Sequence, residues 1–201
     1  MSELSGAARF AELIPQLFHA ADRSALPLIQ EHGLLSARAL ACLFGVPVSE
    51  RPALLTRNRD RFVPLGGNAA SLRVQHMRDG PLRSRLDPAI SLGQWRRFIN
   101  RYAFLWSSRA YAEKLARFER GRTQVVLAWD TVAVLRAGVR LLACRYNNGS
   151  TQDRLPLERR RRRSFGDYLT PEEVEARAQV KEVLALHGIP PSVPFAALET
   201  C

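Results

Sequence analysis

Short apolar stretches follow one another along the chain, and turn-forming residues separate them. Apolar positions in residues 1–16 recur at helical spacing and predict an amphipathic helix, and QLFHA after it predicts a strand. Two short helices should follow, because each apolar stretch has a capping residue before it and a glycine after it. These helices lie between Asp22 or Ser24 and Gly33, and, as ARALACLF, between Ser36 and Gly45.

The middle of the chain alternates between strands and helices. Residues 47–67 are rich in Pro, Arg, Asn and Gly and predict a loop with one helical turn after Ser49. SLRVQHM and YAFLWSS predict strands, and SLGQWRRFIN between them predicts a helix that Ser91 caps. Ser108 caps the next helix, RAYAEKLARFER. The continuous apolar run TQVVLAWD then predicts a buried strand, with VRLLACRY as its neighbour in the sheet.

The last third begins with NNGS, a turn, and RRRRRSFGDY, a basic loop. TPEEVEARAQVKEVLALHG predicts a helix, with a capping box at Thr170 and Glu173. IPPSVPFAALETC predicts a surface tail. The whole chain is therefore expected to be α+β, with roughly five to seven strands in the core. We expect an N-terminal helix at 1–16, one domain at 17–170, and a C-terminal helix and tail at 171–201.

The net charge of the chain indicates a class of binding partner. Lys and Arg number 30 against 19 Asp and Glu, so the formal charge of +11 favours a polyanion such as nucleic acid. The alternative is that a GC-rich genome supplies arginine codons and that the side chains are merely solvated. A dense basic run predicts an exposed arm that contacts phosphates. The run consists of Arg159, Arg160, Arg161, Arg162 and Arg163.

Several function classes lack their signatures. No apolar run reaches the length of a membrane span, and the N-terminus lacks the basic start and apolar middle of a secretory signal, so we expect a cytoplasmic protein. The three cysteines have neither metal-ligand spacing nor a disulfide pattern, which predicts reduced thiols and no metal site. The phosphate-binding GxxxxGK[ST] and GxGxxG motifs are also absent.

One motif points to a reaction. FHAADRSALPLIQEHGLLS combines a strand-borne histidine, a helix and a Gly-Leu pair, and it resembles the N-terminal motif of ADP-ribosyltransferases of the DarT type. The resemblance implies an ADP-ribosyltransferase-like sheet, NAD as the cofactor, and a hydrogen bond from His19 to the nicotinamide-side ribose.

A longer resemblance runs from Phe18 to about Tyr168. FH with HGLLS, LLTRN, LRVQ, the Trp and Asn of QWRRFINRYAFLW, VVLAWDT and NNGST are similar to a family of bacterial domains of unknown function. That family has an acidic residue where Val74 stands here, so the resemblance implies no charge-based role at this position.

Displacement at the nicotinamide ribose carbon passes through an oxocarbenium-like transition state. Such a site needs a group that orients the ribose, cations for the diphosphate, an aromatic surface, and a carboxylate that stabilises the positive charge. The transferases place a glutamate late in the sheet, and Asp153 is the nearest acid to NNGST. The catalytic candidates are His19 and Asp153; the other NAD-binding candidates are Ser36, Arg57, Arg73, Gln75, Tyr102, Phe104, Trp106, Asn148, Ser150 and Thr151.

Each candidate also has a structural interpretation. A histidine at the end of a strand is often a core or turn residue, and Tyr102, Phe104 and Trp106 share one face of a strand, as core residues do. Two other functions stay open beside the NAD-dependent transferase. One is a non-catalytic nucleic-acid-binding or toxin-accessory protein of the same fold, and the other is a nucleotide or nucleic-acid enzyme that uses the fold without NAD.

Overall fold

A computed structural model describes residues 6–75, 77–118, 122–149 and 162–199, and the chain divides into two compact units. Unit 1 comprises residues 1–36, 102–146 and 168–201, and unit 2 comprises residues 37–101 and 147–167. Several predicted site residues lie outside the described residues, namely Ser150, Thr151, Asp153, Arg159, Arg160 and Arg161.

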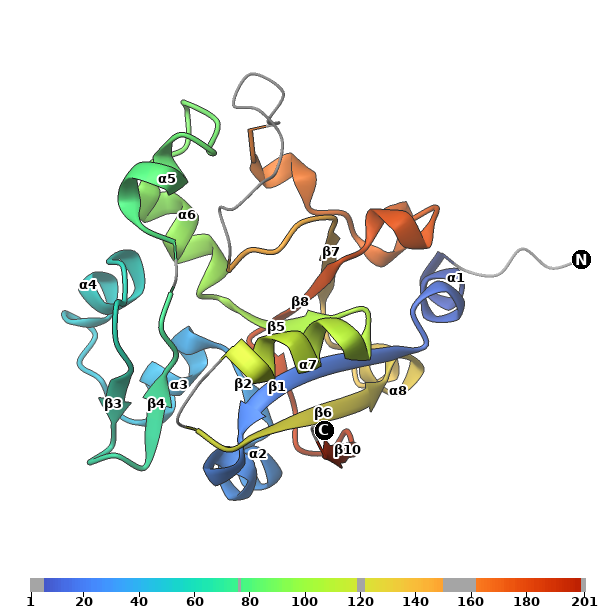
Figure 1. Cartoon of the computed structure of the whole chain (residues 1–201), viewed down its shortest axis with the longest axis horizontal. Helices are drawn as coiled ribbons and strands as arrows, with labels where there is room; N and C mark the ends of the chain where they lie inside the picture. The colour runs from blue at the N-terminus through green and yellow to red at the C-terminus, as the bar shows by residue number, and fades with distance from the viewer. Residues whose placement is uncertain (1–5, 76, 119–121, 150–161, 200–201) are drawn as a thin grey trace, which may run out of the picture. The chain divides into compact units, whose positions relative to one another are not determined.

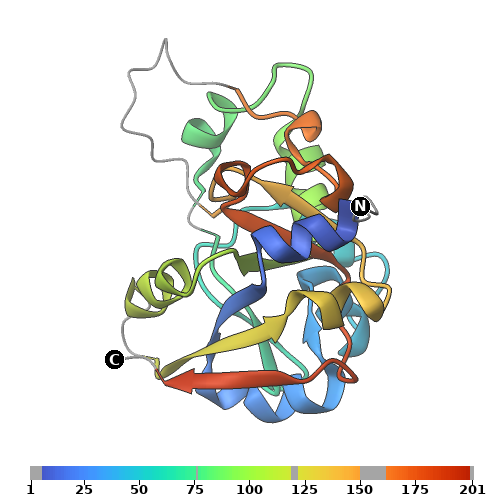
Figure 2. The same ribbon diagram turned by 90° about the vertical axis from the view of Figure 1, so that its right-hand side faces the viewer.

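Unit 1 is built on a six-stranded antiparallel sheet with the strand order β10-β6-β1-β5-β8-β7. Figure 2 shows β1 in blue, β6 in yellow and β10 in red side by side. The α+β fold expected from the sequence is confirmed. The strands are β1 (Gln16–Asp22), β5 (Tyr102–Trp106), β6 (Gln124–Asp130), β7 (Leu141–Cys144), β8 (Glu182–Leu186) and β10 (Phe195–Glu199).

Short helices and a second, two-stranded sheet complete unit 1. The small sheet pairs β2 (Leu34–Leu35) with β9 (Gly188–Ile189). The α-helices are α1 (Gly6–Leu13), α2 (Leu26–His32), α7 (Arg109–Phe118) and α8 (Thr131–Arg136), labelled in Figure 1. The 3-10 helices are η1 (Arg23–Ala25), η4 (Pro171–Glu173) and η5 (Arg177–Gln179).

The large sheet is apolar on both faces. We call one the main core face, where Leu17, Leu105 and Leu127 belong to the larger buried cluster. The other is the α7 face, where Phe18, Trp106 and Ala128 pack with Ala112 of α7 and similar side chains. Successive residues of a strand alternate between the two faces, so the register assigns each strand residue to one of them.

Helices outnumber strands in the described part of unit 2. Its hairpin pairs β3 (Val63–Leu65) with β4 (Ala70–Leu72), and the turn contains Gly66, Gly67 and Asn68 at positive φ, as the GGN sequence favours. Its helices are α3 (Ala37–Leu43), α4 (Arg51–Thr56), α5 (Asp79–Arg83), α6 (Leu92–Ile99) and the 3-10 helix η3 (Phe165–Asp167).

Capping residues placed most helix starts correctly. The Asp22 carboxylate accepts a hydrogen bond from Ser24 N, the Ser91 hydroxyl accepts from Gln94 N, and the Asp130 carboxylate accepts from Ala133 N. Each bond satisfies an amide that the first turn of a helix leaves without a partner.

The helix predicted at 170–188 is wrong. Only its first turn forms, as η4, where the Glu173 carboxylate accepts from Thr170 N. The rest contains η5 and β8, and β8 lies between β5 and β7 in the sheet. Residues 171–201 are therefore not a helix with a surface tail, because β8, β9 and β10 come from them.

The predicted neighbour of β6 is also wrong. VRLLACRY forms β7, which pairs with β8 and is the last strand in the order of the sheet, whereas β6 lies between β10 and β1. On its other side, Ala143 of β7 forms an isolated bridge with Leu169. SLRVQHM forms a strand only as far as Leu72.

Candidate functional site

His19 lies where two strands of unit 1 separate. β1 pairs with β6 along its whole length, but its described register with β5 consists of the single pair Phe18 and Trp106. One residue further, the His19 ring spans to β5, and its Nδ1 lies 2.7 Å from the carbonyl oxygen of Phe104. A carbonyl only accepts, so Nδ1–H donates this bond, and the neutral ring carries its lone pair on Nε2.

Phe18, the residue before His19, belongs to a row of five paired residues that runs across the sheet. Phe18 pairs with Ala128 and Trp106, Trp106 pairs with Glu182, and Glu182 pairs with Cys144. We call this set the Glu182 row. Directly paired residues share a face, so the Glu182 side chain points to the α7 face.

Glu182 is a buried carboxylate. Its exposed fraction is 2%, and no other acidic residue in the described part of the chain is classed as buried. Burying a carboxylate is costly unless nearby groups compensate for the lost water, and such groups concentrate at functional sites. Glu182 is thus a candidate for the carboxylate that the sequence interpretation sought at Asp153.

Aromatic hydroxyls surround this carboxylate. Tyr168 is buried, and its ring meets that of Tyr146 edge-on at 5.9 Å between centroids. Burial raises the pKa of Tyr168 well above its ordinary value, and the neighbouring Tyr146, Cys144 and Glu182 raise it further. Tyr168 therefore stays protonated at neutral pH, beside Glu182. We call Glu182, Tyr146, Tyr168 and Cys144 the carboxylate cluster.

Two glycines fix the HGLLS motif against the late strands of unit 1. A Cβ at Gly33 would lie 2.1 Å from the Ile189 carbonyl oxygen, and one at Gly188 would lie 1.8 Å from that of Leu34. Both glycines have positive φ, so β2 and β9 approach this closely only with glycine at these positions. Ser36 follows β2 directly. It is buried, and its main-chain N–H donates to the His187 carbonyl.

The predicted aromatic residues of β5 pack in the fold. Trp106 is buried on the α7 face and its ring lies 5.6 Å from that of Tyr111. Tyr102 is also buried, and Phe104 supplies the carbonyl that binds His19. The register gives Tyr102, Phe104 and Trp106 the α7 face, whereas His19 projects from β1 on the same side as Leu17 and Ala21.

In unit 2, the LLTRN and LRVQ motifs and Asn100 converge on one network. The Asn100 side-chain oxygen accepts from Arg59 Nη2 at 3.0 Å and from Gln75 Nε2 at 3.2 Å. Its amide donates to the Leu55 carbonyl at 2.7 Å. Arg59 Nε donates to the carbonyl of Arg73 at 3.0 Å. We call Arg59, Gln75 and Asn100 the Asn100 network; Gln75 therefore has a structural role.

The network also contains unbalanced positive charge. Arg59 and Arg96 are both buried, and burial together with the charge of Arg96 lowers the pKa of Arg59 to about 10. Arg96 is compensated by Asp79, whose carboxylate lies 2.6 Å from Nη2. By contrast, Arg57 is exposed and follows α4, and Arg73 is half-buried.

The basic run divides at its end. Arg162 is exposed, as an arm predicts, but Arg163 is buried, which contradicts the prediction for that residue. Arg163 N–H donates to the Arg85 carbonyl, its own carbonyl accepts from Asp87 N, and its guanidinium donates to the Asn147 carbonyl at 3.3 Å. Asn148, a predicted ligand residue, is 1% exposed in the turn that Asn147 begins.

Two further predictions concern metals and membranes. Among the described residues, no group of three or more His, Cys, Asp or Glu side chains could hold a metal ion. No described helix combines the length and the apolar character that crossing a membrane requires. Cys42 and Cys144 are free thiols.

Glu182 is the residue that the sequence interpretation missed. KEVLALHGI contains the continuous apolar run of a buried strand, but the capping box before it favoured a helix. Comparison with curated proteins found no match. The profile of one family matches residues 15–193, in agreement with the resemblance to an uncharacterised family. The chain therefore belongs to DUF7002, a family of unknown function.

Proposed function

We propose that unit 1 is an NAD-dependent ADP-ribosyltransferase-like domain. The observation that carries the proposal is the His19 imidazole, which the Phe104 carbonyl orients at the point where β1 and β5 separate. The buried Glu182 carboxylate lies on β8, the other strand that flanks β5, and its side chain points to the α7 face.

The described residues supply groups that fit NAD. The His19 ring, whose Nδ1 is held by the Phe104 carbonyl, would contact a ribose hydroxyl of NAD. Tyr146 and Tyr168 supply aromatic surface beside Glu182. NAD supplies an activated ribose carbon, whose bond to the nicotinamide nitrogen is the bond that breaks.

The carboxylate would act in the transition state. The nicotinamide leaves with the electron pair of the broken bond, and an acceptor nucleophile forms the new bond and gives its proton to solvent. The ribose carbon becomes electron-deficient between these events, and the negative charge of Glu182 stabilises it most at that point. Glu182 therefore takes the role first considered for Asp153.

The charge of unit 2 favours nucleic acid as the acceptor. In residues 37–101 arginines far outnumber acidic residues, and Arg57, Arg61 and Arg78 are among those that are exposed. Guanidinium groups bind phosphate oxygens in a bidentate manner. The same charge favours the alternative function, a non-catalytic nucleic-acid-binding module of this fold.

Calorimetry with NAD tests the proposal. We expect binding by the wild-type chain and at least tenfold weaker binding by His19→Ala, because the variant loses the hydrogen bond to the ribose. His32→Ala, a histidine at the end of α2, is the matched control and should bind NAD as the wild type does. Absence of heat and of a thermal shift at millimolar NAD would refute the cofactor and leave the binding module.

A further inference from the structure

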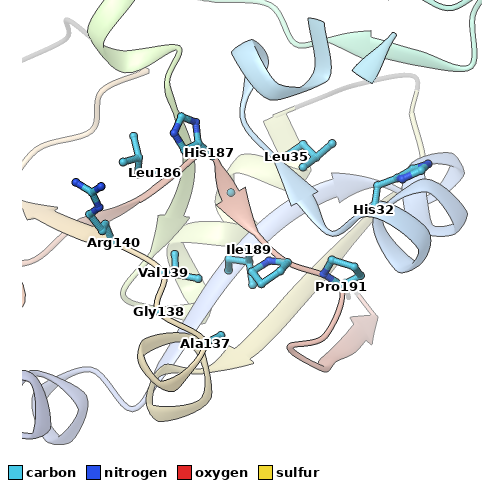
Figure 3. Close-up of a pocket in the computed structure, with 12 residues that line it drawn as sticks. His32, Leu35, Ala137, Gly138, Val139, Arg140, Leu186, His187, Ile189 and Pro191 are labelled. Atoms are coloured by element: carbon cyan, nitrogen blue, oxygen red, sulfur yellow. The ribbon is translucent and has the colours of Figure 1, made fainter. Parts of the chain in front are cut away.

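A second concave site lies in unit 1 beside β9. It is an open hollow of about 400 Å³ between the end of α2, the loop after α8 and the segment that follows β8. This volume lies in the range that small-molecule sites occupy. We call it the β9 pocket; Figure 3 shows its lining, which includes His32, Leu35, Val139, Arg140, His187 and Ile189.

The β9 pocket is separate from the Glu182 row. No residue of β1 or β5 lines it, and its β8 residue is Leu186, which pairs with Tyr102. Glu182 and Leu186 are the two ends of β8. A strand rises about 3.3 Å per residue, so about 13 Å of strand separates the two sites.

Hydrogen bonds of the main chain fix the backbone that carries Arg140 and His187. Leu186 N–H donates to the Arg140 carbonyl at 2.9 Å, which keeps Arg140 beside the residue that precedes His187. The His187 carbonyl accepts from Ser36 N at 3.0 Å. His187 has φ of 66°, a conformation that costs energy for a residue with a side chain, and the close contact of Gly188 with β2 holds it there.

The pocket has a one-sided charge. Arg140, His187 and His32 line it, and no acidic residue does. In the described part of the chain, the side chains of Arg140 and His187 make no hydrogen bond or ion pair. Beside the pocket, the Glu31 carboxylate lies 3.3 Å from His32 Nε2. Figure 3 shows Arg140 and His187 on one side of the pocket and His32 on the other.

The remaining lining is apolar. Leu35, Val139, Ile189 and Pro191 present hydrocarbon surface next to Arg140 and the two imidazoles. A guanidinium and an imidazole bind a phosphate dianion, whereas an apolar wall binds a flat ring or a sugar face. We propose that the β9 pocket binds a phosphate monoester that carries a small ring, of which a nucleoside monophosphate is the simplest example. This proposal does not depend on the NAD chemistry at the Glu182 row.

Calorimetry with AMP, adenosine and inorganic phosphate tests this site. We expect AMP to bind more tightly than either fragment, because only AMP contacts both the cations and the apolar wall. Arg140→Gln should weaken AMP about tenfold or more, since it removes a charged donor to the phosphate. His187→Asn should weaken AMP by a smaller factor, and asparagine tolerates the left-handed backbone at this position.

Two controls keep the outcome specific. Arg136→Gln removes the same charge from an exposed position at the end of α8 that does not line the pocket, and it should leave AMP affinity unchanged. Saturating NAD should also leave AMP bound. Equal weakening of AMP binding by Arg136→Gln and Arg140→Gln would mean that AMP is attracted by the net charge alone, and would overturn the proposal. Displacement of AMP by NAD, together with unchanged affinity in Arg140→Gln, would move AMP to the proposed NAD site and overturn it too.

Discussion

Units 1 and 2 both bury charged side chains, but they compensate the charge in different ways. In unit 2, the Arg59 guanidinium donates to the Arg73 and Leu54 carbonyls and to Asn100. These acceptors come from segments that the guanidinium ties together. In unit 1, Glu182 lies at the start of β8, between β5 and β7, and Tyr146 and Tyr168 lie near it.

The difference teaches how to interpret a motif rich in polar residues. LLTRN and LRVQ include arginines and a glutamine, which suggested ligands for a diphosphate. Their main-chain carbonyls and the Gln75 amide instead serve the Asn100 network. The guanidinium that donates in this network belongs to Arg59, which follows LLTRN, whereas the predicted phosphate ligand Arg57 is exposed. The folding role therefore accounts for much of these motifs.

Among the tests of this comparison, the largest expected effect is on the free energy of unfolding of a variant in unit 2. Arg59→Met retains the apolar stem but removes the donor to Arg73, Leu54 and Asn100. Buried acceptors without donors cost about 1–3 kcal/mol each, so we expect a net loss of about 3 kcal/mol once the relieved desolvation of Arg59 is subtracted. Chemical denaturation measures this free energy of unfolding.

Arg57→Met is the matched control for Arg59→Met. It makes the same substitution two residues away, at an exposed side chain, and should change the free energy of unfolding by less than about 0.5 kcal/mol. Equal stability of the two variants would mean that the Asn100 network does not hold unit 2 together, and the contrast between the units would fail.

The corresponding test in unit 1 is kinetic. Glu182→Gln keeps the shape of the side chain and removes its charge. If the carboxylate acts mainly in the transition state, NAD turnover should fall about 100-fold, the scale for one stabilising group, while NAD affinity stays nearly constant. Initial rates of nicotinamide release with saturating NAD measure the effect, and thermal unfolding verifies that the variant folds.

Asp153→Asn is the comparison for Glu182→Gln, because Asp153 is the acid that the sequence alone suggested. We expect it to be nearly silent in the same rate assay. A large rate loss in Asp153→Asn with a silent Glu182→Gln would reverse the assignment. Glu182 would then be a buried structural carboxylate, comparable to the arginines of unit 2.

Much of the fold could be predicted because local signals dominate it. Ser91 and Asp130 each cap the helix that their spacing predicts, and Asp22 caps the 3-10 helix η1 that precedes α2, since a cap is formed within three residues. The strand at Gln124–Asp130 followed from one continuous apolar run. These features depend on neighbours in the sequence and not on distant parts of the chain.

The predictions failed where the structure of a segment depends on strands that are distant in the sequence. Thr170 and Glu173 form a true capping interaction, but the helix stops after η4, because residues 182–186 gain more from pairing with β5 and β7. That choice depends on strands that lie 40 to 80 residues away in the sequence. The same error kept Glu182 out of the predicted site, because a residue predicted to lie in a helix is not expected in the sheet.

The smallest expected effects concern two neighbouring residues of the basic run, Arg162 and Arg163. Arg162 is exposed and Arg163 is buried, so a neighbouring pair of identical residues tests whether the run contacts phosphates or supports unit 2. Each phosphate contact on duplex DNA contributes about 0.9 to the slope of log affinity against log salt, so Arg162→Ser should reduce that slope by about this amount. Its free energy of unfolding should stay unchanged, because no described partner is lost.

Arg163→Ser should do the opposite. It removes the bond to the Asn147 carbonyl, so we expect a loss of about 1 kcal/mol in stability and the same salt slope as the wild type. Fluorescence anisotropy with a labelled duplex over a salt series, together with denaturation, separates the two quantities. Equal slopes for wild type and Arg162→Ser would mean that DNA does not contact this residue. A reduced slope in Arg163→Ser without loss of stability would instead make Arg163 a ligand for phosphate, and a buried arginine of unit 2 would then bind a partner.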